Sequence, residues 1–319
     1  MRGYPIIRKE SRIILSSLRE AVILFRRNDP LRMAGATAFF TTFALPPIVF
    51  IIAQLFSLFM DRRLIGRGLL ERIANTLGRS GAEQIRDVMR SIRGFSNSWL
   101  TIILGFVFLI FVATTLFGVI INSLNQIWQI GVRQGPESML GLRKRVRSFL
   151  VIMLIGILFF ADLLFDSLAT LTRNYVDAVL KGDGQYFKAV ISELVSLVIV
   201  SAWFTLLFRY LADGRPQWRA ALVGGILTGF LFSAGRSLLR YLLVDSNVGK
   251  LYGSSASLVL VLLFVFYSSF MLYYGGCFIM AYSNDKHWPF RLNKKAYYFK
   301  IEEVAVQPTN EESGLHENQ

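Results

Sequence analysis

Two pairs of charged side chains stand inside long apolar stretches of this chain, each pair with a four-residue spacing. Asp162 and Asp166 form one pair, and Arg236 and Arg240 form the other. A four-residue step places both members of a pair on one face of a helix. An ionisable group in hydrocarbon costs about 2.5 to 3.5 kcal/mol on insertion scales, so such groups face a partner or water. The spacing therefore predicts ion pairing between the helices or recognition of a charged ligand.

The two charged pairs are expected at one depth in a membrane. If the third and fifth apolar stretches run in the same direction, a rise of about 1.5 Å per residue brings both pairs to the same outer layer. Glu193, near the outer start of the fourth stretch, can join them. One interpretation is a charge ladder that only fixes helix packing. The other is a water-accessible cavity open to the outside, whose arginines bind an anionic head group while the aspartates hold them in place.

Residues suited to catalysis are few. His287 and His316 lie near the C-terminus, Cys277 is the single cysteine, and no H-E-x-x-H, P-loop or G-x-S-x-G motif occurs. A catalytic zinc site or a nucleophile triad would need residues that are mostly missing. We therefore expect a protein that is not an enzyme, with no catalytic residue, no cofactor and no metal site.

Six long apolar stretches must position the charged pairs. A membrane helix needs about 20 apolar residues to cross roughly 30 Å of hydrocarbon. The composition agrees, since 54% of the 319 residues are hydrophobic. Backbone groups cannot stay unpaired in lipid, and long apolar runs favour helices over a barrel. The predicted fold is an all-α membrane protein, a six-transmembrane-helix bundle in a membrane domain of residues 29–285, with spans at 31–60, 99–121, 148–171, 189–211, 220–243 and 255–282.

Amphipathic segments are predicted outside the spans. Residues 1–28 carry interspersed arginines, and about residues 64–94 alternate arginines with apolar residues at helical steps. Both segments are expected to form interfacial helices on the membrane. Residues 286–319 are polar and expected to form a largely disordered cytoplasmic tail. The apolar side of the first helix is predicted to hold Ile14, Leu18, Val22 and Phe25.

The first predicted span contains two prolines, and the fifth contains a regular series of small residues. Pro46 and Pro47 remove backbone hydrogen bonds in the first span, which predicts a helix kink or, alternatively, an unwound segment that lines a cavity. In the fifth span, Gly225, Gly229 and Ser233 recur every fourth residue. Such a stripe lets another helix approach closely, so these residues are predicted to serve helix packing.

The net charge of +14 is consistent with a membrane protein whose basic residues lie beside its spans. Lys and Arg flank the spans and are most numerous in the segments that a topology with both termini in the cytoplasm leaves inside. Their expected partners are anionic membrane lipids, and no nucleic acid is expected. A second copy of the chain and envelope proteins are further candidate partners.

Several segments carry a family resemblance: AGATAFFTTFALPPIVFII at 34–52, TLFGVIINSLNQIWQI at 115–130, RPQWRAALVGGILTGFLFSAGRSLLRYLL at 215–243 and LYGSSASLVLVLLFVFYSSFMLYYGG at 251–276. In their order and spacing they resemble the YihY/BrkB family of bacterial inner-membrane proteins, over about residues 20–285. The chain departs from the family at Gly275, Gly276 and Cys277, where members commonly carry an acidic residue after Gly-Ala.

The resemblance implies a multi-pass protein of the bacterial cytoplasmic (inner) membrane. The family has carried the labels ribonuclease BN and virulence factor and has been linked to envelope lipid transport. We hypothesise a transporter or flippase-like protein for an anionic amphipathic substrate, an envelope lipid or lipid-linked precursor. The alternatives are a non-transporting scaffold for envelope proteins and a ribonuclease, for which the sequence offers no metal cluster. Under the transport hypothesis, the substrate-binding or cavity-lining residues are Asp162, Asp166, Arg236, Arg240 and Glu193.

Overall fold

The computed structural model describes residues 4–56, 86, 99–133, 184–244, 256–293 and 295–300. These residues are mostly helical, as predicted. The helices are α1 (Tyr4–Arg27), α2 (Pro30–Phe56), α4 (Trp99–Ile127), α6 (Gly184–Tyr210), α7 (Trp218–Val244) and α9 (Ala256–Asp285). The strands are β1 (Ile130–Val132), β2 (Gly214–Arg215), β3 (Arg291–Leu292) and β4 (Ala296–Tyr298). The predicted span 148–171 lies outside the described residues, as does the predicted interfacial region 64–94 apart from Arg86.

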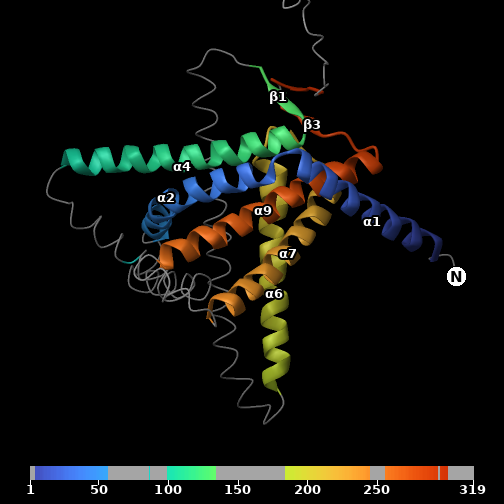
Figure 1. The fold of residues 1–319 in the computed structure, drawn as a ribbon, viewed down its shortest axis with the longest axis horizontal. Helices are drawn as coiled ribbons and strands as arrows, with labels where there is room; N and C mark the ends of the chain where they lie inside the picture. Colours follow the sequence, from blue (N-terminus) through green and yellow to red (C-terminus); the bar gives the residue numbers. More distant parts are fainter. Residues whose placement is uncertain are drawn as a thin grey trace, which may run out of the picture.

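Helix α9 is the centre of the arrangement. It packs against α1, α2, α4 and α7, while α4 also packs on α2 and α6 packs on α7 (Figure 1). The described helices therefore share one main apolar core, and a smaller cluster of Ala38, Val261 and Val265 lies between α2 and α9. Each helix contributes buried side chains to the main core, among them Phe25, Met33, Leu124, Phe208, Ala220 and Phe278.

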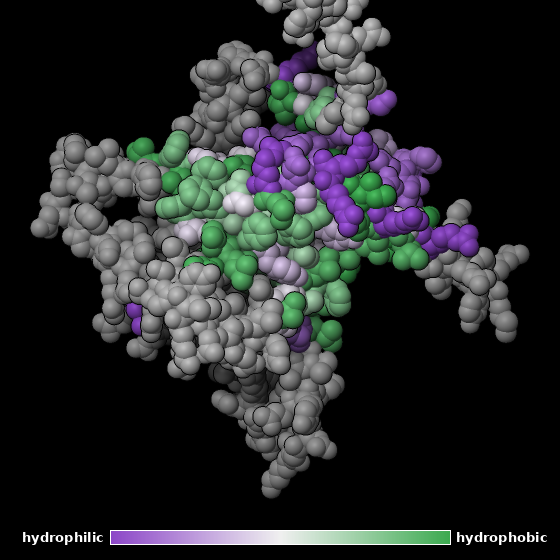
Figure 2. All heavy atoms as spheres, viewed as in Figure 1, coloured by the Kyte–Doolittle hydropathy of each residue, from purple (hydrophilic) through white to green (hydrophobic). Residues whose placement is uncertain are grey.

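Three of the described helices are long and apolar enough to cross a membrane. The qualifying segments are Glu193–Tyr210 in α6, Trp218–Leu238 in α7 and Val261–Asp285 in α9. Large apolar side chains also lie on the outside of α6 and α7, and Figure 2 shows hydrophobic surface over much of the described body. A soluble monomer rarely exposes apolar surface so widely, whereas a membrane helix meets lipid there. The exposed side chains on these two helices include Leu194, Val198, Leu222, Ile226 and Phe230.

Helix α1 packs on α9 through a small buried face. Ser17 and Ala21 are fully buried, and the Phe25 ring meets Phe270 edge to face with 4.6 Å between ring centroids. Of the predicted apolar side of α1, Phe25 is buried in the core and Ile14 and Leu18 pack against it, whereas Val22 is 41% exposed.

The segment after α9 is not simply a disordered tail. β3 pairs antiparallel with β2, and β4 pairs antiparallel with β1. This corrects the prediction for residues 286–293 and 295–300, because strand pairing gives this polar stretch partners that its composition does not reveal. Residues 301–319 lie outside the described residues.

The proline pair of the first predicted span lies within one helix. α2 continues through Pro46 and Pro47 to Phe56, so no unwound segment interrupts it. Membrane helices tolerate proline where neighbouring groups satisfy the freed carbonyls. The predicted kink remains a prediction.

Candidate functional site

Helices α6 and α7 approach each other through small residues. A methyl group added at Gly225 would collide with Thr205, and one added at Gly229 would collide with Ser201. The Thr205 hydroxyl donates to the Ser201 carbonyl at 2.7 Å, so it keeps a hydrogen bond within α6 at this contact. The glycines of α7 therefore lie where the two backbones come closest.

An ion pair joins the same two helices near one end. Arg236 Nη2 of α7 lies 3.2 Å from Glu193 Oε1 of α6. The Arg236 side chain is 26% exposed and the Glu193 side chain 64% exposed. Both residues fall within the segments long and apolar enough to span a membrane. The structure thus brings together two of the five predicted site residues.

The other predicted site residues are placed less completely. Arg240 lies on α7 one turn after Arg236, with its side chain outside the described atoms. Asp162 and Asp166 lie outside the described residues. Their pairing with the arginines stays a prediction.

Polar groups from two helices lie one turn from the ion pair. The ring of Tyr267 on α9 fills the space beside Gly235, and its hydroxyl donates to the Leu231 carbonyl of α7 at 3.0 Å. The hydroxyl of Ser233, the third member of the small-residue stripe, is buried without a hydrogen-bond partner among the described residues. The charged end of α7 is therefore backed by α9, while its other side meets α6.

A second polar cluster lies at the opposite end of α6 and α7. Asn125 Nδ2 of α4 donates to Asp213 Oδ2 at 2.8 Å, and the Asp213 amide donates to Asn125 Oδ1 at 3.0 Å. Asn293 Nδ2 donates to Asp213 Oδ1 at 3.1 Å. Asp213 is buried in the loop between α6 and α7. This junction joins the end of α4 to that loop and to the segment after α9. The sequence analysis did not predict a role for Asp213.

Two further hydrogen bonds hold the bundle around α9. Trp128 Nε1 donates to the Gly276 carbonyl at 2.9 Å, with the indole fully buried. The hydroxyls of Thr37 and Tyr273 lie 2.5 Å apart between α2 and α9. Gly276 has no side chain, which leaves room for Leu124 beside the indole.

A comparison with known families decides the relationship. The family model described as Virulence factor BrkB matches residues 23–297, which is most of the chain. The chain belongs to the BrkB family. It is an integral membrane protein of that family.

Curated relatives of this BrkB-family chain carry the name UPF0761 membrane protein. One from Pseudomonas aeruginosa is 26% identical over 259 residues, covering 80% of this chain and 60% of the relative. One from Teredinibacter turnerae is 24% identical, covering 79% and 57%. One from Haemophilus influenzae is 23% identical, covering 76% and 85%. The chain thus spans about three fifths of the length of the first two relatives. No solved structure matches it.

The segments that carry the BrkB resemblance contact one another in the fold. Asn125 and Trp128 belong to the segment at 115–130, and their partners lie just before the segment at 215–243 and within that at 251–276. Thr37, from the segment at 34–52, meets α9. Within these segments, the L-N-x-I-W run at Leu124–Trp128 and the R-P-x-W-R run at Arg215–Arg219 were the available signals for the Asn125–Asp213 junction.

Proposed function

We propose that this BrkB-family protein moves an anionic amphipathic substrate, an envelope lipid or a lipid-linked precursor, across the cytoplasmic membrane as a transporter or flippase-like protein. The observation that carries the proposal is the Arg236–Glu193 pair between α6 and α7. Charges within membrane-spanning helices are costly and face partners, water or a pathway. The Glu193 side chain is 64% exposed, which supports an accessible site over a dry, closed charge ladder.

The geometry of the pair suits recognition of an anion. A guanidinium has five N–H donors in a rigid fork. Glu193 contacts Nη2 and so fixes the orientation of the Arg236 fork while using only part of it. A phosphate or carboxylate head group can take the remaining donors, and the apolar outer faces of α6 and α7 suit its acyl chains. Asp162, Asp166 and Arg240 complete the same site in this proposal.

The membrane setting is part of the proposal. It has six spans, both termini in the cytoplasm, and α1 lying along the anionic inner surface of a bacterial cytoplasmic membrane. The outward side of α1 supports this placement, because Arg12 and Arg19 are exposed beside Leu15, which is 70% exposed. Mixed basic and apolar side chains suit the headgroup region of anionic lipid.

A non-transporting scaffold for envelope proteins is the alternative, and one experiment separates the two. Lipid analysis of a deletion strain would identify any envelope lipid that accumulates, and that lipid would then be tested in vesicles containing the purified protein. Protein-dependent movement of the lipid is expected. If no lipid moves while partner proteins are lost from the envelope of the deletion strain, the scaffold is correct and the transport proposal fails.

A further inference from the structure

Three arginines gather where α6 ends and the short sheet of β2 and β3 begins. Arg215 and Arg291 are direct partners in the antiparallel register of that sheet. Directly opposed residues project from the same face, with about 4.5 to 5.5 Å between Cβ atoms, and like charges in this arrangement repel each other. Both side chains are exposed. The sheet therefore holds two guanidinium groups side by side at a cost in stability.

Arg209 adds a third positive charge to this pair. It lies in the last turn of α6, and both Arg215 and Arg291 are close enough for their charges to act on it. One of its terminal nitrogens donates to the Pro216 carbonyl, and its guanidinium carbon lies 5.3 Å from the centroid of the Trp218 ring. These contacts fix the Arg209 guanidinium beside the strand pair.

The described carboxylates do not neutralise this cluster. Among the described residues, Arg209, Arg215 and Arg291 form no ion pair, and Arg209 Nε is buried without a hydrogen-bond partner. The nearby Asp213 carboxylate accepts from the Asn125 and Asn293 amides. The cluster thus combines repelling charges with an unused buried donor, which an anion would relieve.

We propose that Arg209, Arg215 and Arg291 form a binding site for a phosphate group. Guanidinium forks bind phosphate oxygens in pairs, and clustered arginines are the usual protein partners of such groups. The rim of the site is aromatic, since Tyr210 and Trp218 are both exposed and meet edge to face with 5.9 Å between ring centroids. The phosphate belongs to a lipid headgroup or to a soluble anion.

This site is separate from the pair proposed for transport. It lies at the ends of α6 and α7 that the loop of residues 211–217 joins, whereas Arg236 and Glu193 lie at their other ends. In Figure 2 the hydrophilic residues gather toward the end of the molecule where α9 and the strands meet. Failure of one site therefore leaves the other proposal standing.

The test uses the full-length protein in lipid nanodiscs and compares thermal unfolding midpoints. One arm adds inorganic phosphate to phosphatidylcholine nanodiscs, with chloride at equal ionic strength as reference. The other arm replaces part of the phosphatidylcholine with phosphatidic acid. The variants are R215Q/R291Q and, as a control with the same loss of charge on exposed arginines of α1, R26Q/R27Q.

We expect phosphate or phosphatidic acid to raise the midpoint of the wild type and of R26Q/R27Q, and R215Q/R291Q to lose about tenfold or more in apparent affinity. The arm that responds identifies the source as soluble or lipid. Without an anion, R215Q/R291Q should be at least as stable as the wild type, because a like-charge pair is gone. Equal responses in both variants, no response in either arm, or a less stable anion-free R215Q/R291Q would overturn the proposal.

Discussion

Asn125 and Asp213, 88 residues apart in the chain, hold each other through two hydrogen bonds. The Asn125 amide donates to the Asp213 carboxylate at 2.8 Å, and the Asp213 backbone N–H returns a bond to the Asn125 side-chain oxygen at 3.0 Å. Both side chains are buried. The pair therefore fixes the α6–α7 loop against the end of α4, and this loop carries β2 and its arginine.

Replacing Asn125 with alanine should lower the free energy of unfolding by about 2 kcal/mol, because a buried carboxylate loses a hydrogen-bond donor. Denaturant unfolding in detergent would measure the change. Asn122→Ala is the matched control, since Asn122 lies on the same helix but is exposed. If both variants unfold at the same denaturant concentration as the wild type, the junction does not stabilise the fold.

The close contact of α6 and α7 predicts opposite effects of one substitution at two glycines. Gly225→Ala should destabilise the protein by about 1 to 3 kcal/mol, because its new methyl group meets Thr205 and the Ser201 backbone. Gly118→Ala on α4 should be neutral or stabilising by up to about 1 kcal/mol, because its methyl group meets no atom within 4 Å and alanine favours a helix. The difference between the two unfolding free energies is the measurement, and equal values would contradict the packing.

The docking of α1 should depend on pH through Glu20. Burial raises the pKa of the Glu20 carboxyl above its usual value of 4.5, and the Asp285 carboxylate adds to this shift. An acid whose pKa is raised in the folded state stabilises docking fully below 4.5, and loses that contribution as pH rises through the folded-state pKa. Docking should therefore weaken through Glu20 as the pH rises above 4.5 and the carboxyl ionises. Spin labels at Leu15 and Asn284, both exposed, would report the separated fraction.

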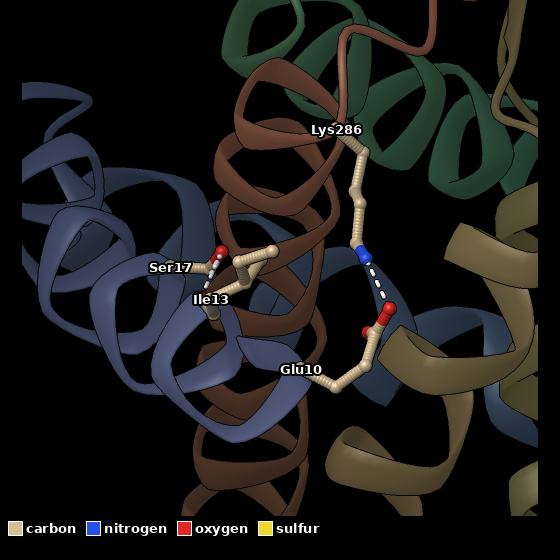
Figure 3. A network of polar contacts seen from close by, with 4 residues as sticks. All are labelled: Glu10, Ile13, Ser17 and Lys286. Atoms are coloured by element: carbon tan, nitrogen blue, oxygen red, sulfur yellow. Dashed lines mark hydrogen bonds and ion pairs between the residues drawn. The ribbon is translucent and has the colours of Figure 1, made fainter. Parts of the chain in front are cut away.

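Two variants isolate the Glu20 contribution from its neighbours. Glu20→Gln should tighten docking at about pH 7 and remove the Glu20 part of the pH dependence. Glu10→Gln should loosen docking, because Glu10 Oε1 lies 2.5 Å from Lys286 Nζ in the network of Figure 3. Asp285, which accepts from the Ser16 and Ser17 hydroxyls at 2.9 and 2.8 Å, is unchanged in both variants and serves as their common background. Equal label separations in the two variants would refute this role of Glu20.

Long apolar stretches in the sequence predicted the positions of helices α7 and α9 closely. The predicted spans 220–243 and 255–282 correspond to α7, Trp218–Val244, and α9, Ala256–Asp285. Four-residue spacing also identified the glycines that face α6. Both features are local, because a helix places residues three and four apart on one side whatever it packs against.

Features that join distant segments could not be predicted in this way. In the sequence Asp213 resembles any other acidic loop residue, and only the fold shows that Asn125 binds it. Likewise, β3 and β4 form by pairing with β2 and β1, which lie far earlier in the chain. Composition does not reveal such pairing, and the polar composition therefore suggested a disordered tail. The Arg236–Glu193 pair was predictable in part. The rise of the helices suggested that Glu193 could lie at the same membrane depth as the arginines, but not that it pairs with Arg236.

The most direct test of the transport proposal is the effect of Arg236→Ala on lipid movement and on stability together. Vesicles containing the protein would carry a fluorescent anionic phospholipid, and its transfer between leaflets would be timed by chemical quenching of the outer leaflet. The pair is partly exposed, so its loss should cost at most about 1 kcal/mol of unfolding free energy. We predict that transfer slows about tenfold or more while stability hardly changes. Unchanged transfer in Arg236→Ala, at wild-type protein levels, would contradict the central claim.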